Sequence, residues 1–185
     1  MSSYANSDLA RVWEDGDAFR APTGTAIPAD IFAPSLSGWD AFGGIRAGFS
    51  VKKDQTVDEL DIWNNKSGAA YKRKKQPVKP TIAFEPVDMS KATALTILRG
   101  GSVVAGNGGY ELIEGEDEDF ALIVRVYDGD EAKAYYVEKG ELGAIPEDKM
   151  DGEDISGFPL EIAPLAPPSG GKAIRQWQKN TNPLA

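Results

Sequence analysis

Residues 39–63 read W-D-A-F-G-G-I-R-A-G-F-S-V-K-K-D-Q-T-V-D-E-L-D-I-W, and this stretch decides the fold class. From residue 45 to residue 52 apolar and polar side chains alternate, with Ile45, Ala47, Phe49 and Val51 on one face. A period of two residues is typical of a half-buried β-strand. The polar run 53–56 predicts a turn and residues 57–63 predict a second strand, so we expect a hairpin over 45–63.

The pattern changes at residues 81–100, which read T-I-A-F-E-P-V-D-M-S-K-A-T-A-L-T-I-L-R-G. The residues before Ser90 continue the strand material that is expected at 71–76 and 80–87. Ser90 is a natural helix N-cap, an apolar stripe at helical spacing follows it, and Gly100 ends the helix. A helix of about three turns is not stable alone, so we expect it to pack on a sheet.

Strand patterns return in the C-terminal half. Residues 120–127 alternate, residues 128–130 turn the chain, residues 132–138 return as a hairpin partner, and residues 158–163 are a last strand candidate. Short strands with frequent turns predict a mainly β fold, an antiparallel β-sandwich or barrel with one short flanking α-helix. We expect an extended N-terminal arm at 1–40, the β-sandwich domain at 41–165 and a C-terminal extension at 166–185.

The N-terminal residues 1–40 show no sustained periodicity, but they contain prolines and well-spaced aromatic side chains. Two interpretations stay open, an extended arm that docks on a neighbour and a partly disordered terminus. Trp13 and Trp177 lie in irregular segments and are candidate interface anchors, because buried Trp contributes disproportionately to binding. Trp63 fits either the core or an interface.

The composition excludes several classes of function. The net charge of −9 disfavours a protein that clamps DNA. The same charge suits either simple solubility or a surface along which DNA slides. The absence of Cys and His removes disulfides, thiolate nucleophiles, His general bases and ordinary zinc sites. No apolar run is long enough to span a bilayer and no signal peptide is evident, so we expect folding in a cytoplasm without membrane insertion.

The charged runs carry no recognisable chemistry. A basic run at 72–75 on a strand points to both faces, so a contact with an acidic neighbour is favoured over DNA binding. The acidic runs at 114–119 and 147–154 lack the ligand spacing of a calcium loop and are expected to be solvated. The glycine-rich segment 100–109 is not a P-loop. We expect no enzyme, no cofactor and no metal. The candidate interface residues are Trp13, Phe19, Phe32, Trp63, Lys72, Arg73, Lys74, Lys75 and Trp177.

Three segments in order, 38–63, 81–99 and 120–142, resemble the tail tube (major tail) proteins of long non-contractile tailed bacteriophages. The resemblance implies six subunits in a ring, inner strands closed into a continuous barrel, and rings stacked into a tube that DNA passes through. The hairpin 45–63 and the strands 120–138 are then candidate barrel elements. The N-terminal arm, the 64–79 loop and the C-terminal segment are candidate contacts between rings.

The same resemblance implies the partners and the location. The subunit would contact copies of itself, the tape-measure protein, and the tail tip and tail terminator proteins, in a virion tail assembled in the host cytoplasm. The alternative is a monomeric β-sandwich binding or decoration domain that recognises a carbohydrate or a protein. Self-association discriminates between the two, because only the first requires it.

Overall fold

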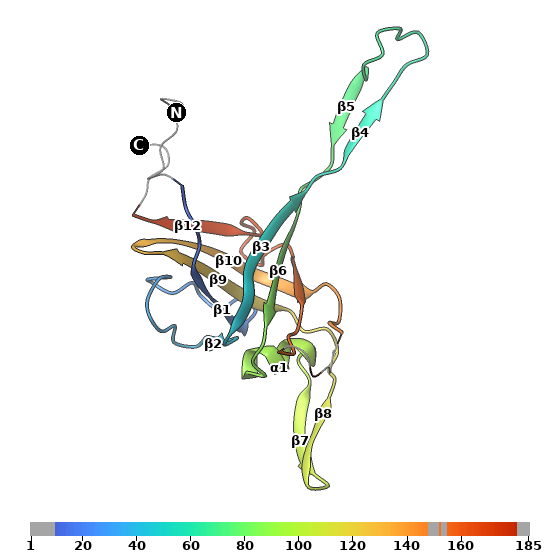
Figure 1. The fold of residues 1–185 in the computed structure, drawn as a ribbon. Coiled ribbons are helices and arrows are strands. Elements are labelled where there is room, and N and C mark those ends of the chain that lie inside the picture. The colour runs from blue at the N-terminus through green and yellow to red at the C-terminus, as the bar shows by residue number, and fades with distance from the viewer. Residues whose placement is uncertain (1–9, 148–151, 153–154, 181–185) are drawn as a thin grey trace.

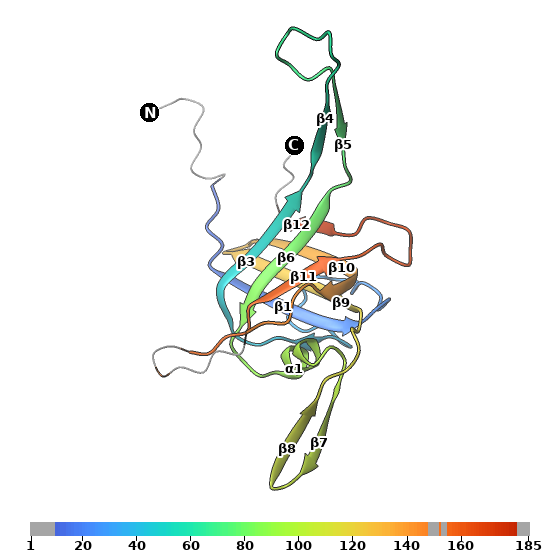
Figure 2. The same ribbon diagram turned by 90° about the vertical axis from the view of Figure 1, so that its right-hand side faces the viewer.

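The computed structural model describes residues 10–147, 152 and 155–180. Most strands form one curved antiparallel sheet in the order β2-β1-β9-β10-β11-β6-β3, with β12 added to β10. The hairpins β4–β5 and β7–β8 project from it (Figures 1 and 2). The elements are β1 (Asp15–Pro22), β2 (Asp40–Ala41), β3 (Ile45–Asp54), β4 (Val57–Leu60), β5 (Lys72–Lys75), β6 (Lys79–Pro86), α1 (Lys91–Ile97), β7 (Ser102–Gly106), β8 (Gly109–Ile113), β9 (Phe120–Asp128), β10 (Glu131–Leu142), β11 (Leu160–Pro164) and β12 (Arg175–Lys179).

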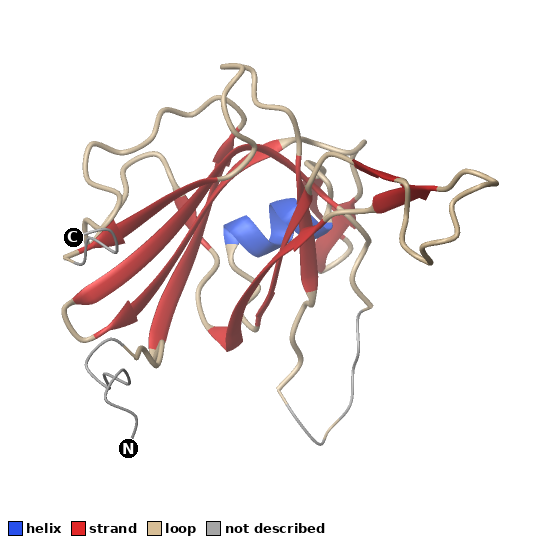
Figure 3. Cartoon of the chain, turned by 90° about the horizontal axis from the view of Figure 1, so that it is seen from above, coloured by secondary structure: helices blue, strands red, loops and turns tan. Residues whose placement is uncertain are grey.

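The sheet folds over into a sandwich because the long strand β10 takes part in both layers. Residues 132–136 of β10 pair with β12, whereas Gly140–Leu142 pairs with β11. A register shift between Val137 and Gly140, within the ladder that β10 forms with β9, marks a bend in β10, as a β-bulge does. The layers are therefore β2-β1-β9-β10-β12 and β3-β6-β11 (Figure 3). This confirms the expected mainly β, antiparallel sandwich with one short helix.

The inner core lies between the two layers. Phe49 of β3 lies opposite Phe84 of β6, which lies opposite Leu160 of β11. Phe84 also packs edge-to-face on Phe42, with 5.0 Å between the ring centroids. Ile45, Phe49 and Val51 of the alternation expected at 45–52 pack on this core. Ala47 does not, because a register shift between Arg46 and Phe49 interrupts the alternation and leaves Ala47 exposed with a φ of 57°.

Strand β9 is buried on both faces. Its residues Phe120–Arg125 are all buried, which explains why this segment is apolar almost throughout. Phe120, Leu122 and Val124 face the inner core. The other face packs against residues 23–39, which cross it as an irregular cover with Ile31, Leu36 and Trp39 buried. The expected hairpin partner is confirmed, because β10 returns along β9 from the turn at residues 129–130.

The expectation of an extended arm at 1–40 is wrong for residues 15–39. Strand β1 pairs with β9 along its whole length, from Asp15 opposite Tyr127 to Pro22 opposite Phe120. Residues 23–39 form the cover of β9, so this segment belongs to the sandwich. The C-terminal extension also contributes a strand, since β12 pairs with β10. Periodicity failed to reveal β1 because four consecutive residues, 18–21, are buried. Residues 1–9 of the expected arm lie outside the described part.

The hairpin expected at 45–63 is also corrected. Strand β3 pairs with β6, and its continuation β4 pairs with β5. Residues 55–56 interrupt the strand but do not turn the chain, because Gln76 N donates to Thr56 O at 2.9 Å across the same ladder. Pro77 lacks a backbone N–H and breaks the opposite strand at this point. The result is one long hairpin that turns at residues 61–71.

The helix expected from residue 90 is confirmed. The Ser90 side chain accepts a hydrogen bond from Thr93 N at 3.2 Å, which caps α1. Thr93 and Thr96 are buried, and the Thr96 hydroxyl donates to Ala92 O at 2.8 Å. The helix lies against one end of the sandwich (Figures 1 and 3). It ends at Ile97, three residues before the expected Gly100, and the chain leaves it through Arg99 and Gly100, whose φ values of 51° and 77° are positive.

Candidate assembly surfaces

The hairpin β4–β5 forms an upper arm, defined as residues 57–75, that projects beyond the sandwich (Figures 1 and 2). Its tip is held locally, because Asn65 N donates to Ile62 O at 3.0 Å and Tyr71 N donates to Asp61 Oδ1 at 3.2 Å. Trp63 is 97% exposed. Leu60, Ile62 and Tyr71 of the same arm are exposed as well, and a group of exposed apolar side chains is typical of a surface that another molecule covers.

The basic run at 72–75 forms β5 and is exposed at every position. Glu59 lies opposite Arg73 and forms an ion pair with it at 2.7 Å. Lys72 and Lys74 point to the other face, as alternate residues of a strand do. This confirms that the basic side chains of residues 72–75 point to both faces of the strand. Across the whole upper arm, five basic side chains stand against three acidic ones.

The hairpin β7–β8 forms a lower arm, defined as residues 102–113, at the opposite end of the molecule (Figures 1 and 2). Asn107 and Gly108 connect its strands with φ of 51° and 82°, the signature of a type I′ turn. Val103 lies opposite Leu112, and Ala105 lies opposite Tyr110, so one face of the arm is entirely apolar. All ten strand residues are exposed.

Strand β8 leads into an acidic linker, defined as residues 114–119, at the base of the lower arm. Arg99, at the end of the helix, pairs with Glu114 at 3.2 Å and with Asp117 at 3.1 Å. Glu118 pairs with the buried Arg20 at 2.7 Å, and Asp119 pairs with Lys139 at 2.7 Å. The expectation of a solvated loop is confirmed, because residues 114 and 116–118 are exposed, and the ion pairs in addition tie the linker to the sandwich. The second acidic run, 147–154, lies mostly outside the described residues.

The outer face of β3-β6-β11 is polar, and no described segment covers it in the way that 23–39 covers β9. Ser50, Ala83 and Glu161 stand side by side on it, since Ala83 lies opposite both of the others. Arg46 and Glu85 form an ion pair at 3.2 Å on the same face. The sandwich thus has one covered and one open outer face.

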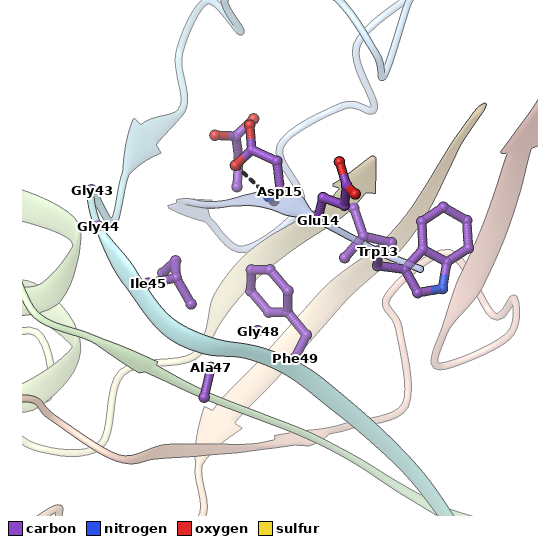
Figure 4. A pocket seen from close by; sticks show the side chains of 12 residues that line it. Trp13, Glu14, Asp15, Gly43, Gly44, Ile45, Ala47, Gly48 and Phe49 are labelled. Atoms are coloured by element: carbon purple, nitrogen blue, oxygen red, sulfur yellow. Dashed lines mark hydrogen bonds between the residues drawn. The ribbon is translucent and has the colours of Figure 1, made fainter. Parts of the chain in front are cut away.

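A cavity of about 620 Å³ lies at the seam between β1 and β3. Ile45 and Phe49 reach into it from β3, and Trp13 stands at its rim (Figure 4). Gly16 is required here, because a Cβ would lie 2.7 Å from the Phe49 ring. The cavity is the gap between two edges of the curved sheet, which approach each other there without pairing.

A buried arginine behind β9, Arg125, was not expected from the sequence. The Arg125 side chain, 2% exposed, donates to Ala33 O at 2.6 Å and to Asp17 Oδ2 at 2.7 Å. Its guanidinium lies 4.5 Å from the Phe19 ring centroid. Arg125 therefore fastens the cover to the sheet. Burial raises the pKa of the neighbouring Tyr127, although the Arg125 charge acts in the opposite direction.

The candidate interface residues divide into two sets. One set lies on the surface and consists of Trp63, residues 72–75 and Trp13, which is 39% exposed. Phe19 is buried inside the subunit, and this removes it from the candidates. Phe32 and Trp177 are half-buried against the same cluster, so for them an interface role stays a prediction. The lower arm was not expected from the sequence, although Asn107-Gly108 between apolar runs is a strong hairpin signal.

Among the described residues, no group of three or more acidic side chains is arranged to hold a metal ion. Within the same part of the chain, no helix has the length and apolar character needed to cross a membrane. No curated protein matches the sequence. A family model described as phage tail tube protein matches residues 4–184. The protein is thus a structural component of a phage tail, one that self-assembles into a tube with other tail components, and the chain belongs to the phage tail tube protein family.

Proposed function

We propose that six copies of this subunit form a ring and that the rings stack into the tube of a long non-contractile tail. The tube serves as the conduit for DNA ejected into the host. Assembly takes place in the host cytoplasm, around the tape-measure protein and between the tail tip and the tail terminator proteins. The subunit acts mechanically and not as an enzyme.

The observation that carries this proposal is the pair of arms at opposite ends of one sandwich (Figure 2). A contact between unlike ends is heterologous, and when it is repeated along one axis it continues without closing. Exposed apolar side chains on both arms, such as Trp63 and Tyr110, give each end a surface to bury. Stacking along the direction of the arms therefore produces a tube from rings.

The open polar face of β3-β6-β11 is the proposed lumen wall. It is the outer face of the sandwich that no described segment covers, and its side chains include Ser50, Ala83 and Glu161. The side chains of this face are exposed or half-exposed and mostly polar, which suits a wall along which DNA slides. Tight binding of DNA would require clusters of Lys and Arg that release the counterions of the phosphates. The covered face, behind residues 23–39, would point to the outside of the tube.

Electron microscopy of the purified protein over a range of concentrations tests the assembly. The expected result is rings or tubes with a central channel, and native mass spectrometry of isolated rings should give six times the subunit mass. A species that stays monomeric at high concentration, even with the tail tip complex supplied, would contradict the proposal and favour the monomeric binding domain.

Cysteine labelling tests the lumen assignment, because the natural chain contains no Cys. Ser50→Cys places a thiol on the open face, and Ser35→Cys places a matched thiol on the exposed surface of the cover. A bulky polymer maleimide should modify both variants as monomers. In assembled tubes it should modify Ser35→Cys alone. Equal modification of the two variants in tubes would refute the lumen assignment.

A further inference from the structure

The two arms carry opposite charges. The upper arm has five basic and three acidic side chains, whereas residues 102–119 at the other end have six acidic side chains and no basic one. Arg99, Arg20 and Lys139 offset part of that acidity. An acidic excess remains at the lower end. The molecule is therefore electrically polar along the direction in which its arms extend (Figure 1).

Several charged side chains at the two ends are available to bind another molecule. Lys72, Lys74 and Lys75 of the upper arm form no ion pair with any described residue, and neither do Glu111 and Glu116 at the lower end. All five are exposed. Because the other acids of the linker are already paired within the subunit, these side chains are the ones available for contacts between copies.

We propose that the basic strand of the upper arm docks on the acidic lower end of a second copy of this chain, and that this charge contrast fixes the head-to-tail polarity of stacking. The proposal rests on the tube function and names the contact between its rings. The apolar face of the lower arm and Trp63 of the upper arm exclude water from the contact, while the charges select the partner end.

The charge contrast also disfavours the wrong arrangements. Two upper ends would bring basic strands together, and two lower ends would bring acidic linkers together. Like charges at a contact discriminate against a competing pairing as effectively as unlike charges favour the correct one. A subunit with two apolar arms of equal charge would lack this selection.

Charge reversal tests the proposal. One variant carries Lys72→Glu with Lys74→Glu, a second carries Glu111→Lys with Glu116→Lys, and a third combines all four changes. We expect each of the first two to need roughly tenfold more protein to polymerise than the natural chain, because each faces like charges at the contact. The third should polymerise nearly as the natural chain does. A matched control, Lys91→Glu with Ser35→Glu and Ser37→Glu, lowers the net charge by the same four units at exposed positions outside both arms and should have little effect.

A mixture of the first two variants gives a more discriminating test of the docking contact. The first two variants, combined in equal amounts, should copolymerise at concentrations where neither polymerises alone, since the reversed arm of one meets the reversed end of the other. Circular dichroism establishes that each variant is folded. Normal polymerisation of both reversed variants, or failure of the combined variant when the control assembles, would overturn the docking proposal while leaving the tube function intact.

Zero-length carbodiimide cross-linking of the natural chain gives an independent measurement. It joins lysine amines to carboxylates in contact, so cross-links between Lys72 or Lys74 of one copy and Glu111 or Glu116 of another are expected. If the natural chain forms no tubes, the tube function fails, yet these cross-links would still support head-to-tail docking. Intermolecular cross-links that avoid both arms would overturn it.

Discussion

Individual buried polar side chains determine how the N-terminal strand β1 and the cover join the sandwich. Arg125 is the best example, because one guanidinium binds the carbonyl oxygens of the cover and the Asp17 carboxylate of β1. A buried cation is tolerated only when such partners replace water. Tyr136 acts in the same way, since its hydroxyl donates to Thr25 O at 3.0 Å at the start of the cover.

Replacing Arg125 by Met should destabilise the subunit. The change leaves the carbonyl groups of Ile31 and Ala33 without a donor, and we expect a loss of about 3 kcal/mol in the free energy of unfolding. Urea denaturation of the monomer measures it. Arg73→Met, at an exposed ion pair, serves as the control and should cost less than about 0.5 kcal/mol. Equal losses in both variants would contradict a fastening role.

Tyr136 should make stability depend on pH in the alkaline range. Burial, followed by the nearby Glu138 carboxylate, raises the pKa of Tyr136 above its ordinary value of 10.0. The neutral phenol therefore contributes fully below pH 10, and its contribution is lost as the pH rises through the folded-state pKa. Tyr136→Phe should lose about 1 kcal/mol near neutral pH and show a smaller decline above pH 10. Thermal melts over a pH series provide the comparison. An unchanged alkaline decline would count against this assignment.

At the scale of elements, the lower arm depends on glycines where its base meets the helix. Gly115 N donates to Leu98 O at 2.8 Å, and Gly101 N donates to the same oxygen at 2.8 Å. A Cβ on Gly101 would overlap the carbonyl oxygen of Ile113. The backbones of the two strands approach too closely there for any side chain. The end of α1 thus sets where the arm begins.

Gly101→Ala should therefore displace the arm or strain its base, at a cost of about 1–3 kcal/mol. Gly106→Ala is the matched control, because a Cβ at Gly106 meets no atom within 4 Å and its φ is not positive. Chemical denaturation gives the stability, and amide exchange of β7 and β8 reports the arm itself. If the two variants behave alike, close backbone approach does not hold the base.

At the scale of the whole molecule, the sandwich is completed by β1 and its cover. Removing residues 1–35 would expose the edge and one face of β9, a strand that is otherwise buried. We expect this truncated chain not to fold, as judged by circular dichroism and the loss of a cooperative melt. Replacing the upper arm, residues 57–75, by an Asn-Gly turn should instead leave a folded subunit that does not stack. A folded truncated chain would restore the idea of a separate docking arm.

Local patterns predicted those elements whose environment differs between their two faces. The alternation at 45–52, the turn at 129–130 and the Ser90 cap each depend on neighbours in the sequence. The structure contains the turn and the cap, and it contains the alternation except at the register shift that exposes Ala47. Strand β1 was not predicted, because both of its faces are buried and its sequence therefore shows no alternation of apolar and polar residues. Two exposed candidates, Trp63 and the basic strand β5, came from the sequence, whereas the apolar lower arm emerged only in the structure.

By itself the sequence determined the mainly β composition, the β9–β10 hairpin, the capped helix and the absence of Cys and His chemistry, and it carried the family resemblance. Only the tertiary structure decided that β3 pairs with β6, that β1 completes the sheet, and that the two charged arms lie at opposite ends. Short-range patterns fix turns and caps, because those interactions join residues close in the chain. Strand partners and the direction of the arms depend on burial between distant segments, which no local pattern records.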